Sequence, residues 1–130
     1  MSHSRPASIP PGLRVRCARA RIRPGMEREA ERWMQMLNDR HEEAVRTLER
    51  ERVAIEIVFR ERDDDGDWLM WVMIQGDGGA SIEDSPFDID RDHAAFAERV
   101  KLPNRPEAEP QLLLLPEPVR DAVLGWAISD

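Results

Sequence analysis

The stretch Asp67-Trp-Leu-Met-Trp-Val-Met-Ile-Gln75 decides the fold, because it reads as a β-strand that is apolar on both faces. Successive side chains of a strand point to opposite sides of the sheet. The two rows are Trp68, Met70, Val72 and Ile74 on one face and Leu69, Trp71 and Met73 on the other. Such a strand is typically buried on both sides. We therefore expect the sheet that contains it to be covered twice.

The segments around this strand alternate between strand and helix periodicity. The pattern predicts strands over 13–23, 53–62, 67–75 and 111–115, and helices over 26–52, from Asp88 or Asp90 to 102, and over 118–128. Asp63-Asp64-Asp65-Gly66 is typical of a hairpin turn between the second and third strands. The order is β-α-β-β-α-β with an extra C-terminal helix, which is the arrangement of ferredoxin-like folds. The predicted fold class is therefore α+β with an antiparallel sheet.

Two helices can cover one face of this sheet, which leaves the other face unprotected. An exposed apolar patch larger than a few hundred Å² usually marks an interface. Face-to-face packing of two sheets would bury it. We therefore expect a homodimer formed through the sheet face, in which Trp71 and its strand neighbours meet the sheet of a second copy.

Length and composition predict one domain. The chain has 130 residues, which suits a single core. Three prolines and several small polar residues predict a disordered N-terminal arm over 1–11, followed by one domain over 12–130. The chain has a single cysteine, and it lacks both a signal-like apolar segment and an apolar run of about 18 residues. We expect a cytoplasmic protein that does not insert into a membrane.

The acidic balance argues against two classes of partner. The formal net charge is -7, whereas nucleic-acid binding and anionic membranes call for a basic surface. The residues before Glu27 depart from this balance, because they include six arginines and no acidic residue. The simplest interpretation is that these arginines pair with acidic side chains of the helix that follows. An anionic ligand or an acidic partner surface is the alternative.

Several spaced residues resemble a family of small uncharacterised bacterial proteins of the dimeric α/β barrel type. The resemblance runs from about Leu13 to Leu102. It is carried by Arg21-Ile-Arg-Pro-Gly25, Leu37-Asn-Asp-Arg40, Glu43-Ala44, Thr47-Leu48, Val53, Glu56, Phe59 and Gly66. Where that family tends to carry His-Pro-Ile-Asp, this chain has Ser85-Pro-Phe-Asp88. The resemblance implies a dimeric barrel whose members include cofactor-independent oxygenases, haem-degrading enzymes and ligand-sensing regulators, so it implies no single activity.

Glu56, His41 and His93 are the main candidates for chemistry. Glu56 lies between Ile55 and Ile57 on an apolar strand, where an unpaired charge is costly. We expect it to pair with Arg19 or Arg21, either as a structural ion pair or to orient a ligand. His41 and His93 lie on the apolar stripes of the two helices and could face one cleft as bases or ligands. Simple packing at the edge of the core is the ordinary alternative.

The leading hypothesis is a small-molecule-binding dimeric α/β barrel, which could act as a cofactor-independent enzyme. Its expected pocket lies between sheet and helices and involves Arg21, His41, Glu56, Trp71 and His93. The four tryptophans could line such a pocket, although core packing is the more ordinary explanation because each falls on an apolar stripe. The sequence contains no metal-ligand spacing and no nucleotide-binding loop, so no metal and no cofactor are expected. The alternative is a non-catalytic dimerisation or regulatory module.

Overall fold

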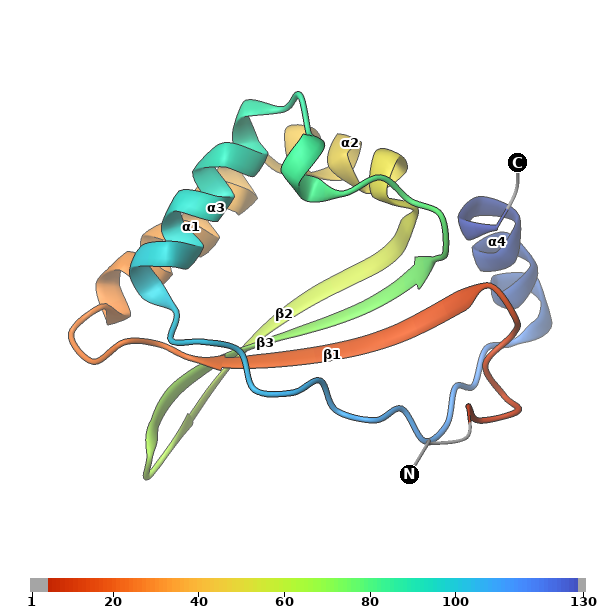
Figure 1. The fold of residues 1–130 in the computed structure, drawn as a ribbon, viewed down its shortest axis with the longest axis horizontal. Helices are drawn as coiled ribbons and strands as arrows, with labels where there is room; N and C mark the ends of the chain where they lie inside the picture. The colour runs from red at the N-terminus through yellow and green to blue at the C-terminus, as the bar shows by residue number, and fades with distance from the viewer. Residues whose placement is uncertain (1–4, 129–130) are drawn as a thin grey trace.

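The chain forms a mixed α+β structure with one three-stranded antiparallel sheet (Figure 1). The structure is a computed structural model, and it describes residues 5–128. The strands are β1 (Leu13–Arg21), β2 (Val53–Asp63) and β3 (Gly66–Gly76), in the order β1-β3-β2. The helices are α1 (Glu27–Asp39), α2 (His41–Glu51), α3 (Asp88–Val100) and α4 (Glu117–Ala127), with a short 3₁₀ turn at Ile82–Asp84.

The central strand is β3, which is why its sequence is apolar on both faces. It pairs antiparallel with β1 and with β2, so that Trp71 lies opposite Ala18 on one side and Val58 on the other. The predicted hairpin is confirmed. Asp63 accepts hydrogen bonds from the backbone N–H groups of Asp65 and Gly66. Gly66 has a φ of 139°, which favours glycine because a Cβ there is strained.

The helix predicted over 26–52 is in fact two helices, α1 and α2, which meet at Arg40. The backbone of Arg40 has φ -105° and ψ 37°, outside the helical range. Its N–H still closes α1 by donating to the carbonyl of Met36. Asn38 and Asp39 precede the break, and both residue types favour turns because their side chains compete for backbone hydrogen bonds. The break allows α1 and α2 to run in different directions above the sheet (Figure 1).

The strand predicted over 111–115 is wrong. Residues 101–108 instead run along the free edge of β1, where Leu102, Arg105 and Ala108 donate backbone hydrogen bonds to Arg21, Arg19 and Cys17. Only every third residue of this segment donates, which matches the three-fold repeat of a polyproline helix. Proline has no N–H to donate, and Pro103 and Pro106 fall between the donors. The leucine run further along is split: Leu113 and Leu115 pack against the core, whereas Leu112 and Leu114 are exposed.

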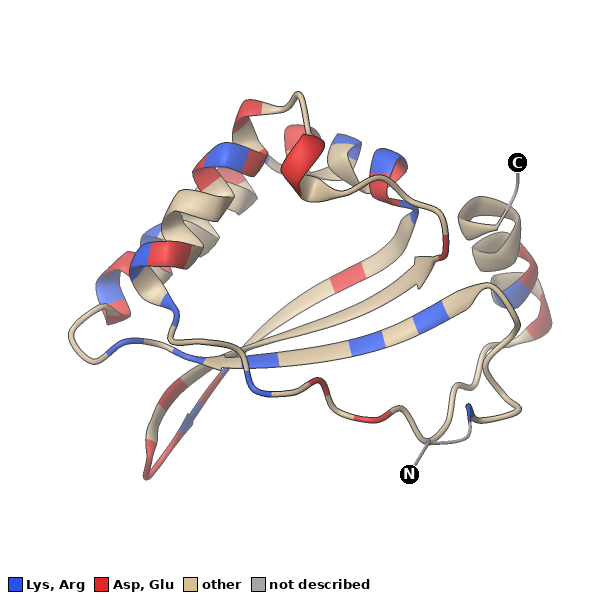
Figure 2. Cartoon of the chain, viewed as in Figure 1, with Lys and Arg blue, Asp and Glu red and all other residues tan. Residues whose placement is uncertain are grey.

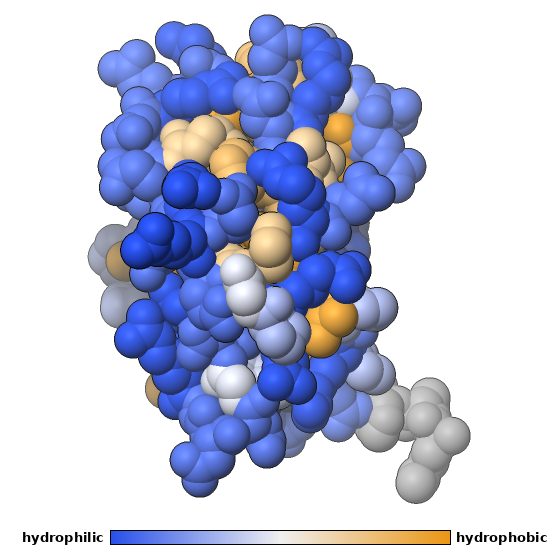
Figure 3. Space-filling model, turned by 90° about the vertical axis from the view of Figure 1, so that its left-hand side faces the viewer, coloured by the Kyte–Doolittle hydropathy of each residue, from blue (hydrophilic) through white to orange (hydrophobic). Residues whose placement is uncertain are grey.

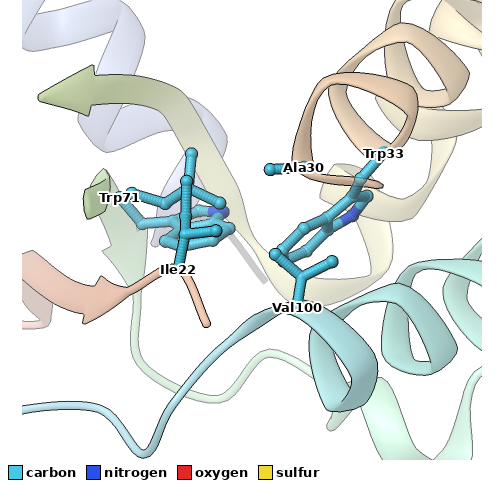
Figure 4. Close-up of a cluster of buried hydrophobic side chains, with 6 residues drawn as sticks. Ile22, Ala30, Trp33, Trp71 and Val100 are labelled. Atoms are coloured by element: carbon cyan, nitrogen blue, oxygen red, sulfur yellow. The ribbon is translucent and has the colours of Figure 1, made fainter. Parts of the chain in front are cut away.

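The main core lies between the sheet and helices α1 and α3 (Figure 4). Trp33 of α1 is fully buried, and its ring centroid is 5.4 Å from that of Trp71 on β3. The Trp33 indole N–H donates to Nδ1 of His93 on α3 at 2.9 Å. Trp33 therefore contacts the sheet and α3 at once. The side of the molecule that carries α1 and α3 is mostly hydrophilic outside, with hydrophobic groups in the gaps (Figure 3).

The prediction that Trp71 meets a second sheet is wrong, because α1 covers its side of β3. The opposite face carries a smaller core beneath α4, made by Ile9, Leu13, Ile74, Val123 and Ala127. Ile9 is 5% exposed, so this core takes in part of the stretch expected to be an N-terminal arm. Residues 1–4 of that predicted arm lie outside the described residues. Further along this face, Arg19 and Arg105 cover the ring of Trp68, which is 5% exposed. Ile57 and Phe59 are uncovered there, at 43% and 50% exposure.

Two further features bear on partners. Basic residues recur along β1, and acidic and basic residues are interspersed along the helices (Figure 2). The prediction that the N-terminal arginines pair with the following helix is wrong for Arg16 and Arg19. Arg16 pairs with Glu107, and Arg19 pairs with Glu61 and Asp63 of β2. No helix within residues 5–128 combines the length and apolar character needed to cross a membrane.

Replacing Trp33 by alanine should destabilise the protein strongly. The change removes a fully buried ring and leaves Nδ1 of His93 without its donor, and such losses cost about 3–5 kcal/mol. Trp126→Ala is the matched control, because Trp126 is 42% exposed. We expect it to cost about 1 kcal/mol, mainly from the lost hydrogen bond to the Val53 carbonyl. Urea unfolding measures both free energies, and equal losses would contradict the role given to Trp33.

Candidate functional site

An apolar groove of about 400 Å³ lies between β2 and the helix pair α1 and α2. The bend at Arg40 sets its shape, because the two helices contribute to the wall from either side of the break. It is lined by Met34, Leu37, Asn38, His41, Ala44, Val45, Leu48, Glu56, Ile57 and Val58. Glu56 is the only acidic side chain in this lining.

A small acidic pocket of about 50 Å³ adjoins the groove. It is lined by Leu37, Ala44, Thr47, Glu51, Glu56, Ile82, Ile89, Asp90 and His93. The groove and the pocket share Leu37, Ala44 and Glu56. Three carboxylates thus converge from three elements, Glu51 from α2, Glu56 from β2 and Asp90 from α3. We call this cavity the acidic pocket.

Glu56 stands where the groove and the acidic pocket meet. Strand alternation places it on the helix side of β2, opposite Met73 of β3. Within residues 5–128 it makes no hydrogen bond or ion pair. The predicted pairing with Arg19 or Arg21 is not found, because odd-numbered residues of β1 point to the opposite face. There Arg19 binds Glu61 and Asp63 at 3.0 and 3.2 Å.

Burial is the main cause that raises the pKa of Glu56, and the charge of Asp90 adds to it. Glu56 as a residue is nevertheless exposed to solvent. Nearby protein atoms partly desolvate the carboxylate, which also lines the groove. Glu56 is therefore both perturbed and reachable.

Glu51 is perturbed more strongly. Burial raises its pKa to about 7, with further contributions from the negative charges of Asp90 and Glu56. A hydrogen bond with Thr47 and the charge of Arg50 act in the opposite direction without offsetting these effects. Close to neutral pH, Glu51 is therefore shared between its protonated and ionised forms.

Asp90 is the most deeply buried carboxylate of the pocket, at 9% exposure. It lies in the first turn of α3, but it does not cap the helix. Phe87 occupies the N-cap position and no side chain caps the helix end. The side chain of Asp90 makes no hydrogen bond or ion pair within the described part of the chain. Its carboxylate is left to face the pocket.

His93 contributes a neutral ring to the pocket wall. Burial is the main cause that lowers its pKa; Asp90 acts to raise it and Lys101 to lower it further. Because Nδ1 accepts from Trp33, the proton of the neutral ring resides on Nε2. His41 lies elsewhere: it is exposed at the start of α2 and lines the groove. The two histidines thus border adjoining cavities, which meet at Glu56.

Arg21 and Trp71, the other predicted site residues, line neither cavity. Trp71 belongs to the main core and is 8% exposed, with the Lys101 ammonium 4.9 Å from its ring centroid. Arg21 lies on the opposite face of the sheet, over Gly66. Sequence reasoning missed Glu51 and Asp90. Glu51 follows Thr47 by one helical turn, and this spacing could have placed both on the inner side of the helix.

Within residues 5–128, no group of three His, Cys, Asp or Glu side chains is arranged to hold a metal ion. A model of a family of unknown function (DUF6176) matches residues 13–121. No curated protein matches the chain. No solved structure matches it either. The matched range contains every residue that lines the groove and the acidic pocket.

Glu51→Gln should stabilise the protein at alkaline pH. A carboxyl whose pKa is higher in the folded than in the unfolded state lowers stability as pH rises from about 4.5 towards 7. The variant's advantage should therefore be small at pH 5 and reach on the order of 1–2 kcal/mol at pH 8, after allowance for partial screening. Urea unfolding at both pH values measures it. The exposed neighbour Glu49, as Glu49→Gln, is the control, and an equal gain there would contradict the assignment.

Proposed function

The chain belongs to this family of unknown function (DUF6176), and we propose that it binds a small molecule in the groove between β2 and the helices α1 and α2. The observation that carries this proposal is the position of Glu56 where the groove meets the acidic pocket, with no hydrogen-bond or ion-pair partner among residues 5–128. Partial burial and the charge of Asp90 disfavour the ionised form of Glu56. A ligand that bonds to Glu56 would offset this effect.

The size and lining of the groove support the proposal. Sites for small molecules typically enclose about 300–1,000 Å³ and combine apolar walls with a few convergent polar groups. The groove has about 400 Å³, apolar walls from Leu37, Ala44 and Val58, and Glu56 as its acid. Carboxyl groups with perturbed pKa values occur preferentially at functional sites.

The raised pKa of Glu56 also supports a class of reaction. A carboxylate whose pKa is raised is a better proton acceptor near neutral pH. Glu56 is open to the groove, and neutral His93 can donate from Nε2 at the pocket wall. We propose cofactor-independent proton transfer as the chemistry that these residues could perform on a bound substrate.

The sheet supports a ferredoxin-like arrangement. The order β1-β3-β2 with antiparallel pairing corresponds to three strands of a βαββαβ sheet. The segment 101–108 runs along β1, where the fourth strand of that arrangement would lie. We propose that the chain is a ferredoxin-like variant whose fourth strand is replaced by a proline-rich extended segment.

A homodimer through the open part of the sheet is the second element of the proposal. Helix α4 covers only the Ile74 end of that face. Beyond it, Ile57 and Phe59 are exposed beside Met70 and Val72, which are partly exposed. This patch lies next to the paired charges of Arg19 and Glu61, and the mixed signs suit a two-fold interface with itself. We therefore propose a second copy as its occupant and a dimeric α/β barrel as the assembly.

Two further proposals concern the partners of the protein and its location in the cell. A net charge of -7 supports partners other than nucleic acid. A single cysteine, Cys17, suits the reducing conditions of the cytoplasm.

Filling the groove should abolish binding. We would use 1-hexanol as the probe, because it has an aliphatic body and one hydroxyl, and follow it by ¹H–¹⁵N chemical shift mapping. Ala44→Phe places a ring at a residue common to groove and pocket, and it should reduce binding at least tenfold. Ala94→Phe makes the same change at an exposed position of α3 and should leave binding unchanged.

Circular dichroism establishes whether both variants fold. Failure of the wild-type protein to bind 1-hexanol in the groove would contradict ligand binding and favour a non-catalytic dimerisation module. Loss of binding in Ala94→Phe as well would show that the probe binds elsewhere.

Native mass spectrometry tests the dimer. We expect the wild-type protein to be dimeric at micromolar concentration and Phe59→Glu to be monomeric, because the change places a charge in the middle of the apolar patch. Val119→Glu is the control, since Val119 is similarly exposed but lies on α4. A monomeric wild-type protein would contradict this part of the proposal.

A further inference from the structure

The acidic pocket indicates the chemical class of the ligand. We propose that the protein binds a primary alkylamine in its ammonium form, with the ammonium group in the acidic pocket and the aliphatic body in the groove. This inference rests on the proposed binding function and adds the charge and orientation of the ligand.

Charge is the first argument. Glu51, Glu56 and Asp90 all line the pocket, and no Lys or Arg side chain lines it. His93 does not supply the missing positive charge, because burial lowers its pKa. Two nearby arginines, Arg50 of α2 and Arg40 at the break before α2, are engaged elsewhere. Arg50 donates to the carbonyls of Ser81 and Asp84, and Arg40 pairs with Glu43 and Asp92.

Asp90 provides an independent argument. It is more than nine-tenths buried and lines the pocket, yet within residues 5–128 its side chain has no hydrogen-bond or ion-pair partner. Buried carboxylates in proteins are generally paired or hydrogen-bonded. A cationic donor in the pocket would satisfy Asp90 together with the two glutamates.

The small size of the pocket favours a compact cationic group. The pocket has about 50 Å³, against about 400 Å³ for the groove. An ammonium group is more compact than a guanidinium or a quaternary ammonium. An ammonium group also has N–H donors for the carboxylate of Asp90, which lines the pocket.

The lining of the groove indicates the chemistry of the rest of the ligand. It begins at the residues that it shares with the pocket and continues past Met34, Val45 and Leu48, which are apolar. It offers no second acidic group that would bind a diamine at its far end. A monoamine with an aliphatic chain therefore matches the cavity better than a polyamine.

Protonation should couple to binding. The groups that face the pocket are Glu51 from α2, Glu56 from β2, and Asp90 and His93 from α3, with Arg50 beside Glu51. A bound ammonium favours the ionised form of each carboxylate, so Glu51 must release its proton when the ligand binds below neutral pH. Affinity should increase between pH 6 and pH 8.

Isothermal titration calorimetry on the full chain tests the inference with three probes that share one aliphatic body. They are n-hexylammonium, 1-hexanol and hexanoate. We expect n-hexylammonium to bind at least tenfold more tightly than 1-hexanol, hexanoate to bind more weakly than either, and the n-hexylammonium affinity to rise from pH 6 to pH 8.

Variants assign the effect to the acidic pocket. Asp90→Asn should reduce n-hexylammonium affinity at least tenfold and leave 1-hexanol affinity within about twofold. Glu51→Gln should reduce n-hexylammonium affinity and remove the pH dependence. It provides a second test if Asp90→Asn fails to fold. Glu49→Gln, on the exposed side of α2, should change neither affinity.

The outcomes separate the two proposals. Equal binding of n-hexylammonium and 1-hexanol would overturn the amine assignment and leave the binding groove intact. Tighter binding of hexanoate would overturn it too. Absence of binding by all three probes would overturn the binding groove itself, and the amine assignment with it.

Discussion

The structure depends on the contacts of Trp33. This side chain is fully buried between α1, β3 and α3, where it packs on Trp71 and donates to His93. The ring contacts bury apolar surface, while the hydrogen bond connects two helices that are distant in the sequence. Because the indole N–H has one direction, it fixes the rotation of α3 as well as its distance from α1. The helix layer is thereby held at a defined position above the sheet.

That position determines what the helices bring to the sheet. Asp90 lies one helical turn before His93 on α3, so the hydrogen bond that fixes His93 also fixes Asp90 near Glu56. Gly79 in turn allows the chain after β3 to pass close to the backbone of Glu51 at the end of α2. A Cβ on Gly79 would lie 2.0 Å from the Glu51 carbonyl oxygen. The contact of Trp33 with His93 and the close approach of Gly79 to Glu51 therefore both position residues of the acidic pocket. Three carboxylates held close together without a cation oppose folding, and such costs are typical of functional sites.

Sequence periodicity predicted the central strand, the hairpin and the unusual position of Glu56, because each depends on local alternation. It did not predict which layer covers which face. Trp71 and Trp68 belong to equally apolar rows, and only the tertiary structure shows that α1 covers the row of Trp71. The helix break at Arg40 was hidden because the apolar stripe continues through it. The leucine run 111–115 resembled a strand by composition, although the prolines before it favoured an extended segment with three-fold repeat. Glu51 and Asp90 could not be assigned to one pocket, because they converge only when two helices and a strand are packed together.

The central claim is that the helix layer desolvates carboxylates that lie close together. A carbon-13 NMR titration of the glutamate and aspartate side chains in the unliganded protein tests it most directly, with Glu51→Gln used to assign the signal. The structure predicts that Glu51 titrates with a midpoint of about 7 and that the midpoint of Glu56 is raised from its usual value. Titration of both groups near 4.5, as in exposed glutamates, would contradict the account.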